Sequence, residues 1–267
     1  MNKKKFALMF ASIALIASTV LFGTLAYFTD SESVANTFTV GNINIMLDEE
    51  IVDEYGVPTG EGRTQDPTDA TEKEGNEYKL VPGRTYVKDP TMTVAKGSEP
   101  AYIRMLVTIS HIEVFDAIFD AMDNATNQVD KPELMDIFNG YDKDSATDEI
   151  ETLWKYHAEY RSQTTTPGTI TYEFRYYDDS KADNKAIFDA RTAAEDIKLP
   201  ALFDSFTVPA YFGSAQIQDL DGMTITVIGQ AIQADTFADE NAAWDAFDDQ
   251  VVVNNNYKSP YANTATP

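Results

Sequence analysis

The segment that decides the fold is AYIRMLVTI at residues 101–109. Its alternate positions from Ala101 to Ile109 are all apolar, and Tyr102 and Leu106 add apolar groups to the opposite face. Period-two alternation is typical of a β-strand, and apolar side chains on both faces indicate a strand that is covered on both sides. The sequence therefore predicts a central, fully buried strand.

Two aromatic-rich segments predict a hairpin next to this strand. Residues 154–161 and 170–176 both alternate rings with charged or polar residues, and a Thr-rich turn ending at Pro167-Gly168 separates them. Because both arms keep period two, we expect an antiparallel pair with its rings on one face and a solvated charged face on the other.

Four further strands are predicted, at 37–48, 86–94, 202–208 and 223–234. The first should carry a bulge at Gly41, and the second should be broken at Pro90. Residues 49–77 are rich in Asp, Glu, Thr, Gly and Pro, which predicts a surface loop. About eight strands with few helices indicate a mainly β fold. We predict an antiparallel, jelly-roll-like β-sandwich with short helices inserted in its connections.

Helices are expected in the connections. Ser110 and Glu113 have the spacing of a capping box, and Phe115, Ile118, Phe119 and Met122 follow at helical spacing. The other predicted helices are a short one at 132–138, a weak one at 186–197, and a capped one at 236–247 with Ala243, Trp244 and Phe247 turned inward.

The amino terminus predicts export. Three lysines at 3–5 precede an apolar run at 6–22 and the small-x-small site Thr24-Leu25-Ala26, which places cleavage between Ala26 and Tyr27. The predicted organisation is a secretory signal at 1–26, one sandwich domain at 27–250 and a flexible tail at 251–267. A retained signal-anchor is the alternative, because residues 6–28 are nearly long enough to span a bilayer.

Composition excludes several classes of function. Asp and Glu total 44 against 20 Lys and Arg, so the net charge of −24 repels nucleic acid. With no Cys and only His111 and His157, a thiolate site or a zinc site of several imidazoles cannot be built. No HExxH, GxSxG or phosphate-loop motif is present. We therefore predict no catalytic residues, no metal site, no cofactor and no enzymatic activity.

Calcium is expected to associate only weakly. Asp142, Asp144 and Asp148 imitate the start of a calcium-binding loop, but Ala146 and Leu153 stand where ligands are needed. The predicted association is a diffuse one with the acidic surface.

A family resemblance lies in the residues around the predicted cleavage site. The stretches GTLAYFTD at 23–30 and NTFTVGNINI at 36–45 resemble the SipW-type export signal and first strand of the TasA/camelysin family of Gram-positive bacteria. The likeness continues in LVPG at 80–83, KDP at 88–90, AYIR at 101–104 and QAIQAD at 230–235. The helical insertions have no counterpart in it.

This resemblance implies a secreted structural subunit of extracellular matrix (biofilm) fibres, freed by a SipW-type signal peptidase and assembled into a homopolymer by donor-strand exchange. Other matrix proteins are implied partners, the location is the extracellular matrix or the cell surface, and membrane contact is confined to the precursor. Cleavage would free an extended segment that can complete a neighbour's open sheet edge, and head-to-tail pairing of this kind does not close. The expected donor-strand residues are Tyr27, Phe28, Phe38, Val40, Ile43 and Ile45.

Two alternatives stay open. Relatives described as camelysins imply a cell-surface metalloendopeptidase, although no zinc-ligand pattern matches in this sequence. A surface adhesin or carbohydrate-binding sandwich is the other alternative, which exposed rings at Tyr156, Tyr172 or Tyr176 would favour, whereas core packing is the usual fate of alternating rings.

Overall fold

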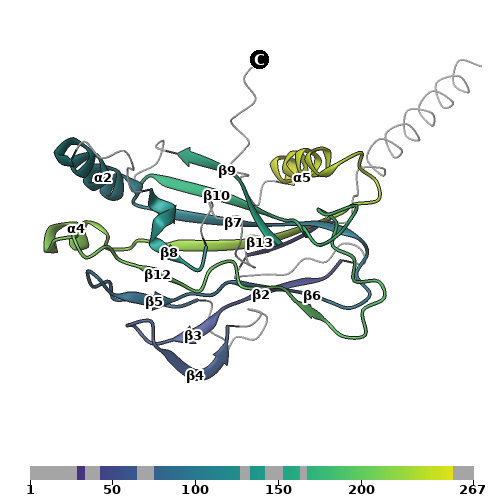
Figure 1. The fold of residues 1–267 in the computed structure, drawn as a ribbon, viewed down its shortest axis with the longest axis horizontal. Helices are drawn as coiled ribbons and strands as arrows, with labels where there is room; N and C mark the ends of the chain where they lie inside the picture. Colours follow the sequence, from purple (N-terminus) through teal and green to yellow (C-terminus); the bar gives the residue numbers. More distant parts are fainter. Residues whose placement is uncertain are drawn as a thin grey trace, which may run out of the picture.

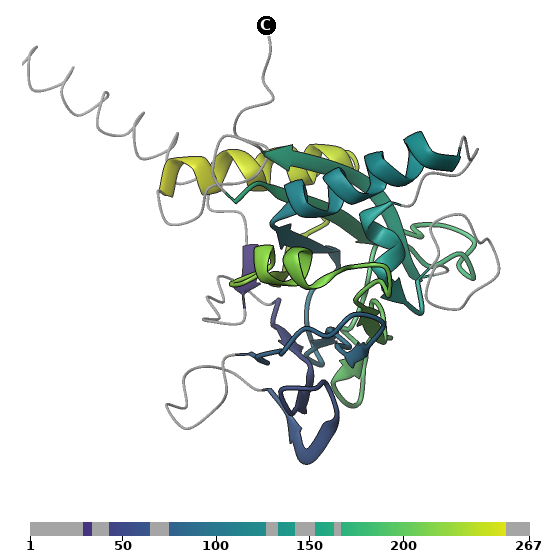
Figure 2. The ribbon, with the colours of Figure 1, turned by 90° about the vertical axis from the view of Figure 1, so that its left-hand side faces the viewer.

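The computed structural model describes residues 29–33, 43–64, 75–126, 133–141, 153–162 and 167–254. These residues form a mainly β, antiparallel structure, which confirms the predicted class. A five-stranded sheet in the order β1-β13-β7-β10-β9 lies over a layer of two three-stranded sheets, β11-β6-β2 and β5-β12-β8 (Figure 1). The β3–β4 hairpin lies at the outer side of this second layer, and Figure 2 shows the layers from the end where α2 and α4 lie.

The elements have the following bounds. The five-stranded sheet contains β1 (Thr29–Ser33), β13 (Ile225–Gln233), β7 (Ala101–Ser110), β10 (Thr169–Tyr176) and β9 (Trp154–Ser162). The second layer contains β2 (Ile45–Asp48), β6 (Thr91–Val94), β11 (Ile197–Lys198), β5 (Thr85–Val87), β12 (Ser205–Thr207) and β8 (Phe138–Asn139), beside the hairpin of β3 (Glu50–Val52) and β4 (Pro58–Arg63). The helices are α2 (Ile112–Thr126), α4 (Ser214–Asp219), α5 (Glu240–Asn254) and the 3-10 helix η1 (Leu134–Ile137).

The predicted central strand is confirmed as β7. It pairs with β13 on one side and β10 on the other, and nine of its ten residues are buried. One face of β7 carries Ile103, Met105, Val107 and Ile109 into the main core between the layers. The layers touch where β13 has Gly229, because a Cβ there would lie 2.7 Å from Met92 Cε.

The predicted hairpin is confirmed as β9 and β10; its charged side chains are exposed on β9, at Glu159 and Arg161, but buried on β10. Glu173 is 1% exposed and Arg175 is 8% exposed, because α5 packs over this face of the sheet. A strand pattern of alternating charges cannot show that a distant helix covers it.

The predicted capping box does not form, although the helix does. Ser110 belongs to β7, and its hydroxyl accepts a hydrogen bond from the Thr224 N–H at 2.9 Å. His111 makes the sharp turn into α2 with a φ of 59°, and the Glu113 carboxylate accepts from the Gly168 N–H at 3.1 Å. Phe115 and Phe119 of α2 are buried as predicted.

Three other segments differ from prediction. The strand predicted at 86–94 is broken at Pro90 into two separate strands, β5 and β6, which join different sheets. No helix occurs at 186–197. Phe188 instead forms a β-bridge with Ala101, and this segment ends where β11 begins. The predicted loop at 49–77 contains the β3–β4 hairpin in its described part.

The carboxyl-terminal helix is confirmed, with Ala243, Trp244 and Phe247 buried, and it continues to Asn254 beyond the predicted domain end. The short helix predicted at 132–138 is the single 3-10 turn η1, followed by β8. Within the described ranges, no helix has the length and apolar character that crossing a membrane requires.

Candidate functional site

The first feature of the site is a sheet edge that the described strands cover only in part. β1 pairs antiparallel with the outer edge of β13, from Thr29 opposite Ile232 to Ser33 opposite Ile228. The inner edge of β13 is paired with β7 along its whole length. Among the described residues, no strand pairs with the outer edge of β13 over 225–227. Unpaired strand edges are templates for pairing with another chain.

A groove of about 1160 Å³ begins at this uncovered stretch. It lies between β13 and β2, which is the edge strand of its own sheet in the second layer. Leu47, Phe206, Ile217, Leu220 and Met223 contribute apolar side chains to its lining. An extended chain that pairs with β13 here would have an apolar surface beside it.

Aromatic rings support the wall of the groove. Tyr78 and Phe206 both line it, with ring centroids 5.2 Å apart in an edge-to-face contact, and Tyr86 stacks on Phe206 at 5.1 Å. The Tyr78 hydroxyl donates to the Val87 carbonyl at 3.1 Å. Burial, helped by the charge of Glu49, raises the pKa of Tyr78 well above its ordinary value, so this hydroxyl keeps its proton even at pH values at which an exposed tyrosine ionises.

The other end of the groove is polar and internally paired. Lys88 Nζ lies 2.6 Å from Glu49 Oε2, and each side chain is only 7% exposed. The Glu49 N–H donates to Thr64 Oγ1 at 3.0 Å, and Asn76 Nδ2 donates to Glu49 Oε1 at 3.1 Å. These bonds tie the residues that follow β4 and precede β5 to the end of β2.

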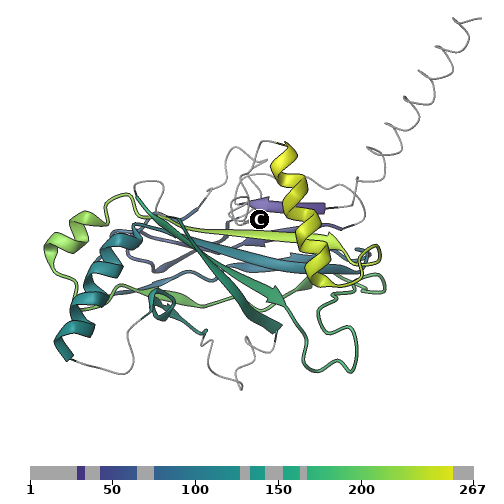
Figure 3. The same cartoon turned by 90° about the horizontal axis from the view of Figure 1, so that it is seen from above.

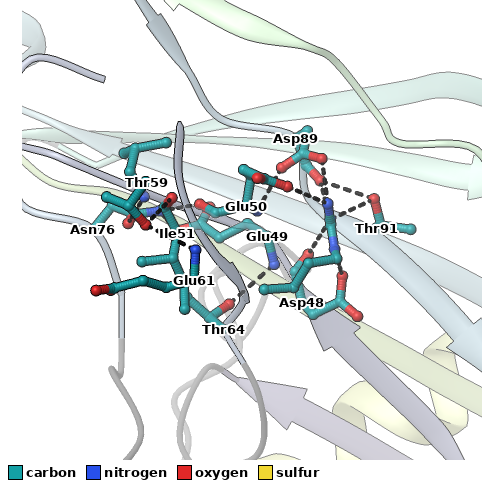
Figure 4. Close-up of polar contacts among 12 residues, drawn as sticks. Asp48, Glu49, Glu50, Ile51, Thr59, Glu61, Thr64, Asn76, Asp89 and Thr91 are labelled. Atoms are coloured by element: carbon teal, nitrogen blue, oxygen red, sulfur yellow. Dashed lines mark hydrogen bonds and ion pairs between the residues drawn. The ribbon is translucent and has the colours of Figure 1, made fainter. Parts of the chain in front are cut away.

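Arg63, at the end of β4, bonds to residues beside this polar end, among them Asp48, Asp89 and Thr91, which Figure 4 shows close together. Its guanidinium donates to the carboxylate of Asp48, to Asp89 Oδ2 at 2.6 Å and to Thr91 Oγ1 at 3.0 Å, and it lies 3.7 Å from Glu50. Burial lowers the pKa of Arg63, but the bonds to Asp89 and Asp48 outweigh it and the net pKa is raised. The arrangement fixes the β3–β4 hairpin to β2 and β6.

The sequence-predicted assembly residues fall into two groups. Ile43 and Ile45 are each 1% exposed in the main core of their own chain, where Ile45 begins β2. Ala26, Tyr27, Phe28, Phe38 and Val40 lie outside the described residues. Thr29–Ser33, which lies between Phe28 and Phe38 in the sequence, is the strand that the structure places on β13.

Sequence reasoning did not find the groove. Its apolar lining comes from β2, β12, α4 and the turn before β13, which lie far apart in the chain. The only local signal is the turn at Asp221-Gly222 before a long uncharged strand, which marks where β13 starts but not what lies beside it.

The tyrosines considered for sugar stacking are part of the core. Tyr172 is 2% exposed and Tyr176 is 3% exposed, and Tyr156 packs partly buried against the same core. Tyr176 makes edge contacts with Trp154 and Phe188. These rings therefore do not form a sugar-stacking surface.

The predicted first strand and export signal lie in a segment that matches a family model. Residues 1–59 match the family model described as camelysin metallo-endopeptidase. The match confirms the predicted family resemblance. This camelysin segment contains β1, β2 and β3 and ends within β4, before Arg63. No curated protein and no solved structure matches the chain.

The camelysin description implies a metal ion, so we tested the available ligands. Nowhere in the described ranges do three or more His, Asp or Glu side chains come together so that they could hold a metal ion. The carboxylates of Asp48 and Asp89 at the groove are bonded to the Arg63 guanidinium. His111 Nδ1 lies 2.9 Å from Ser110 Oγ, and His157 is exposed on β9. The described part of the chain does not fit a metal-dependent peptidase site.

Proposed function

We propose that this protein is a secreted subunit of extracellular matrix fibres, which polymerises when the segment containing β1 leaves its own β13 and pairs with β13 of a second copy. The observation that carries the proposal is the position of β1. It is an edge strand of five residues, continuous with a stretch of the same edge that no other described strand pairs with and that opens onto a partly apolar groove. The identical strand of another copy can replace a strand in this position, because it makes the same pairing with β13.

The register of β1 indicates how an incoming strand uses the groove. Extending the observed pairing by one residue places Val34 of the donor opposite Val227, and four residues further places Phe38 opposite Met223. Both receiving residues line the groove. The donor therefore brings apolar side chains to the apolar part of the groove while its backbone completes the open edge.

The part of the chain that moves is limited by the core. Because Ile43 and Ile45 are buried in their own subunit, the exchanged segment ends before Ile43. Residues 27–42 comprise ~16 residues, which can span roughly 50 Å when extended at ~3.3 Å per residue. This reach is enough to connect the bodies of two adjacent domains.

Engineered cysteines test the exchange directly, because the chain has no Cys of its own. Asp30 lies opposite Ala231 in the β1–β13 pair, a spacing that suits a disulfide. We expect a mixture of Asp30→Cys and Ala231→Cys single variants to form disulfide-linked dimers when filaments grow. Asp30→Cys mixed with Lys198→Cys, at an exposed position of β11, is the control and should remain unlinked.

The double variant Asp30→Cys/Ala231→Cys completes the test. Oxidised as a monomer, it has β1 locked to its own β13, and we expect it to form no filaments until it is reduced. Filaments that grow from the oxidised monomer, or that show no cross-links between chains in the mixture, would refute strand exchange.

The family description leaves a peptidase as the second candidate. Because the described residues offer no converging metal ligands, we expect the secreted protein to show no peptidase activity that EDTA removes and zinc restores. Cleavage of a denatured protein substrate in that pattern would overturn this part of the proposal.

A further inference from the structure

Helix α5 follows β13 and packs across the face of the five-stranded sheet that points away from the main core (Figure 3). Its Trp244 and Phe247 form a separate apolar cluster with Tyr102 of β7 and Ile232 of β13. Trp244 is 1% exposed and Ile232 is fully buried. The helix therefore covers this end of the sheet with a small core of its own.

Beside this cluster, Arg104 joins α5 to three strands. Its side chain is 1% exposed and donates to Gln230 of β13 at 2.7 Å, to Glu173 of β10 at 3.4 Å and to Asp248 of α5 at 2.5 Å. The guanidinium carbon also lies 4.2 Å from the centre of the Trp244 ring. A buried arginine that bonds to two neighbouring strands and a helix fixes these elements relative to one another.

Arg175 of β10 makes a second connection to the helix. It donates to Glu173 at 2.7 Å and to Asn241 Oδ1 of α5 at 2.7 Å, and it lies 4.0 Å from Glu240. Glu173 therefore bonds to both arginines, and each arginine reaches α5. We call Arg104, Glu173, Arg175, Asn241 and Asp248 the polar clamp.

The polar clamp acts on the same residues of β13 that carry β1. Gln230, which bonds to Arg104, pairs with Ser31, and Ile232, which packs under α5, pairs with Thr29. We propose that the polar clamp is a kinetic gate, in which docked α5 holds β13 in place and so slows the release of β1 from its edge. This inference rests on the proposed strand exchange, whose rate it would control.

The gate changes the rate of exchange rather than its end point. A donor strand from a second copy meets the same β13 and the same docked α5 as the chain's own β1, so the clamp stabilises both states alike. The opened state between them has lost the strand and is the state that a rigid β13 disfavours. Loosening the clamp should therefore speed filament growth without changing how much filament forms.

The test uses Asp248→Asn, which weakens the bond to Arg104. The control is Asp245→Asn, the same charge change at an exposed position of the same helix. In dilute monomer, we expect amide hydrogen exchange in residues 29–33 and 228–233 to be at least about tenfold faster in Asp248→Asn, because part of a buried ion pair is lost. Exchange in the control should match the parent protein.

Glu240→Gln supplies a change in the opposite direction, so that the test does not depend on a weakened fold. Burial raises the pKa of the Glu240 carboxyl, and its Oε1 has no hydrogen-bond partner among the described residues. Removing this buried charge should stabilise the docking of α5 on the sheet and therefore slow amide hydrogen exchange at the β1–β13 edge.

The outcomes separate the gate from the proposed function. Faster opening and a faster start of polymerisation in Asp248→Asn, with an unchanged final amount of filament, support the gate. Equal exchange rates in Asp248→Asn, Glu240→Gln and the parent overturn it, whether or not filaments form. Faster opening in Asp248→Asn without any filaments in any variant would keep the gate at the β1–β13 edge and refute fibre assembly.

Discussion

Two arginines hold parts of this molecule together, and they do so differently. Arg63 is 21% exposed, and its charged partners lie between 13 and 26 residues away in the chain, so it fixes a local hairpin beside the groove. Arg104 is 1% exposed and bonds to Asp248, 144 residues away. The first arginine shapes a site, whereas the second connects the carboxyl-terminal helix to the centre of the sheet. We therefore expect Arg104 to contribute more than Arg63 to the free energy of unfolding.

The largest effect is expected for Arg104→Ala. This change leaves Glu173 and Asp248 without their shared cation, and loss of one partner of a buried ion pair costs about 3–5 kcal/mol. The measurement is the free energy of unfolding in urea. Arg104→Lys should recover only part of the loss, because an ammonium group cannot reproduce the fork of bonds. A loss below about 1 kcal/mol in Arg104→Ala would show that the polar clamp contributes little to the free energy of unfolding.

A smaller loss is expected for Arg63→Ala. Hydrogen bonds to charged groups contribute about 1.5–3 kcal/mol, and solvent partly replaces the bonds at this site. The change should increase hydrogen exchange in residues 50–63 while leaving β7 and β13 protected. If Arg63→Ala destabilised the chain as much as Arg104→Ala, the distinction between a local and a long-range arginine would be wrong.

The Glu240 carboxyl is expected to make the docking of α5 depend on pH. Burial is the main cause of its raised pKa and outweighs the attraction of Arg175. The other groups that face it are Trp244, Glu173 and Arg104, with Tyr102 nearby on β7 and Asp239 just before α5.

A raised carboxyl pKa means that the folded state binds this proton more tightly than the unfolded state does. Stability from this group is therefore present below the ordinary value of 4.5 and is lost as pH rises through the higher folded value. Glu240→Gln should be more stable than the parent near pH 7, and the difference should shrink as the pH falls towards 4.5. Thermal unfolding of both proteins between pH 7 and pH 4.5 measures this difference in stability. A difference that stays constant with pH would contradict a raised pKa for Glu240.

The smallest effect is expected for Arg161→Ala. Arg161 makes two bonds to Asp116, at 2.9 and 3.0 Å, but it is 39% exposed. Exposed pairs contribute roughly 0–1 kcal/mol, and salt screens them further. This variant is the reference for the two arginines above, because it removes the same side chain from a solvated pair. If Arg161→Ala lost as much free energy of unfolding as Arg63→Ala, burial would not explain why the three arginines differ in their contribution to stability.

Local patterns in the sequence predicted the strands well and their surroundings poorly. The alternation in 101–109 and 170–176 identified β7 and β10, and the spacing of Ala243, Trp244 and Phe247 identified the buried face of α5. None of these patterns shows that α5 lies over Glu173 and Arg175. Burial of charge depends on contacts between distant elements, which period and propensity do not record.

The candidate site was predictable only at its amino-terminal side. The family resemblance around the predicted cleavage point implied an extended segment that completes a neighbour's sheet edge, and β1 lies at a sheet edge of its own chain. Ile43 and Ile45 continue the same alternation, yet they belong to their own subunit's core, because the chain passes from one layer to the other before β2. Alternation indicates a strand but not which sheet receives it.

Gly229 has a consequence for the geometry of a fibre. Because no side chain stands at this position, the methyl group of Met92 fills the space and the two layers touch just inward of Val227, the last groove residue on β13. The groove therefore ends at this contact, and in the proposed exchange an incoming strand continues past it along the edge of β13, with its Glu32 opposite Gly229. The same register at every joint gives a constant axial repeat, so the length of a filament would be proportional to its number of subunits.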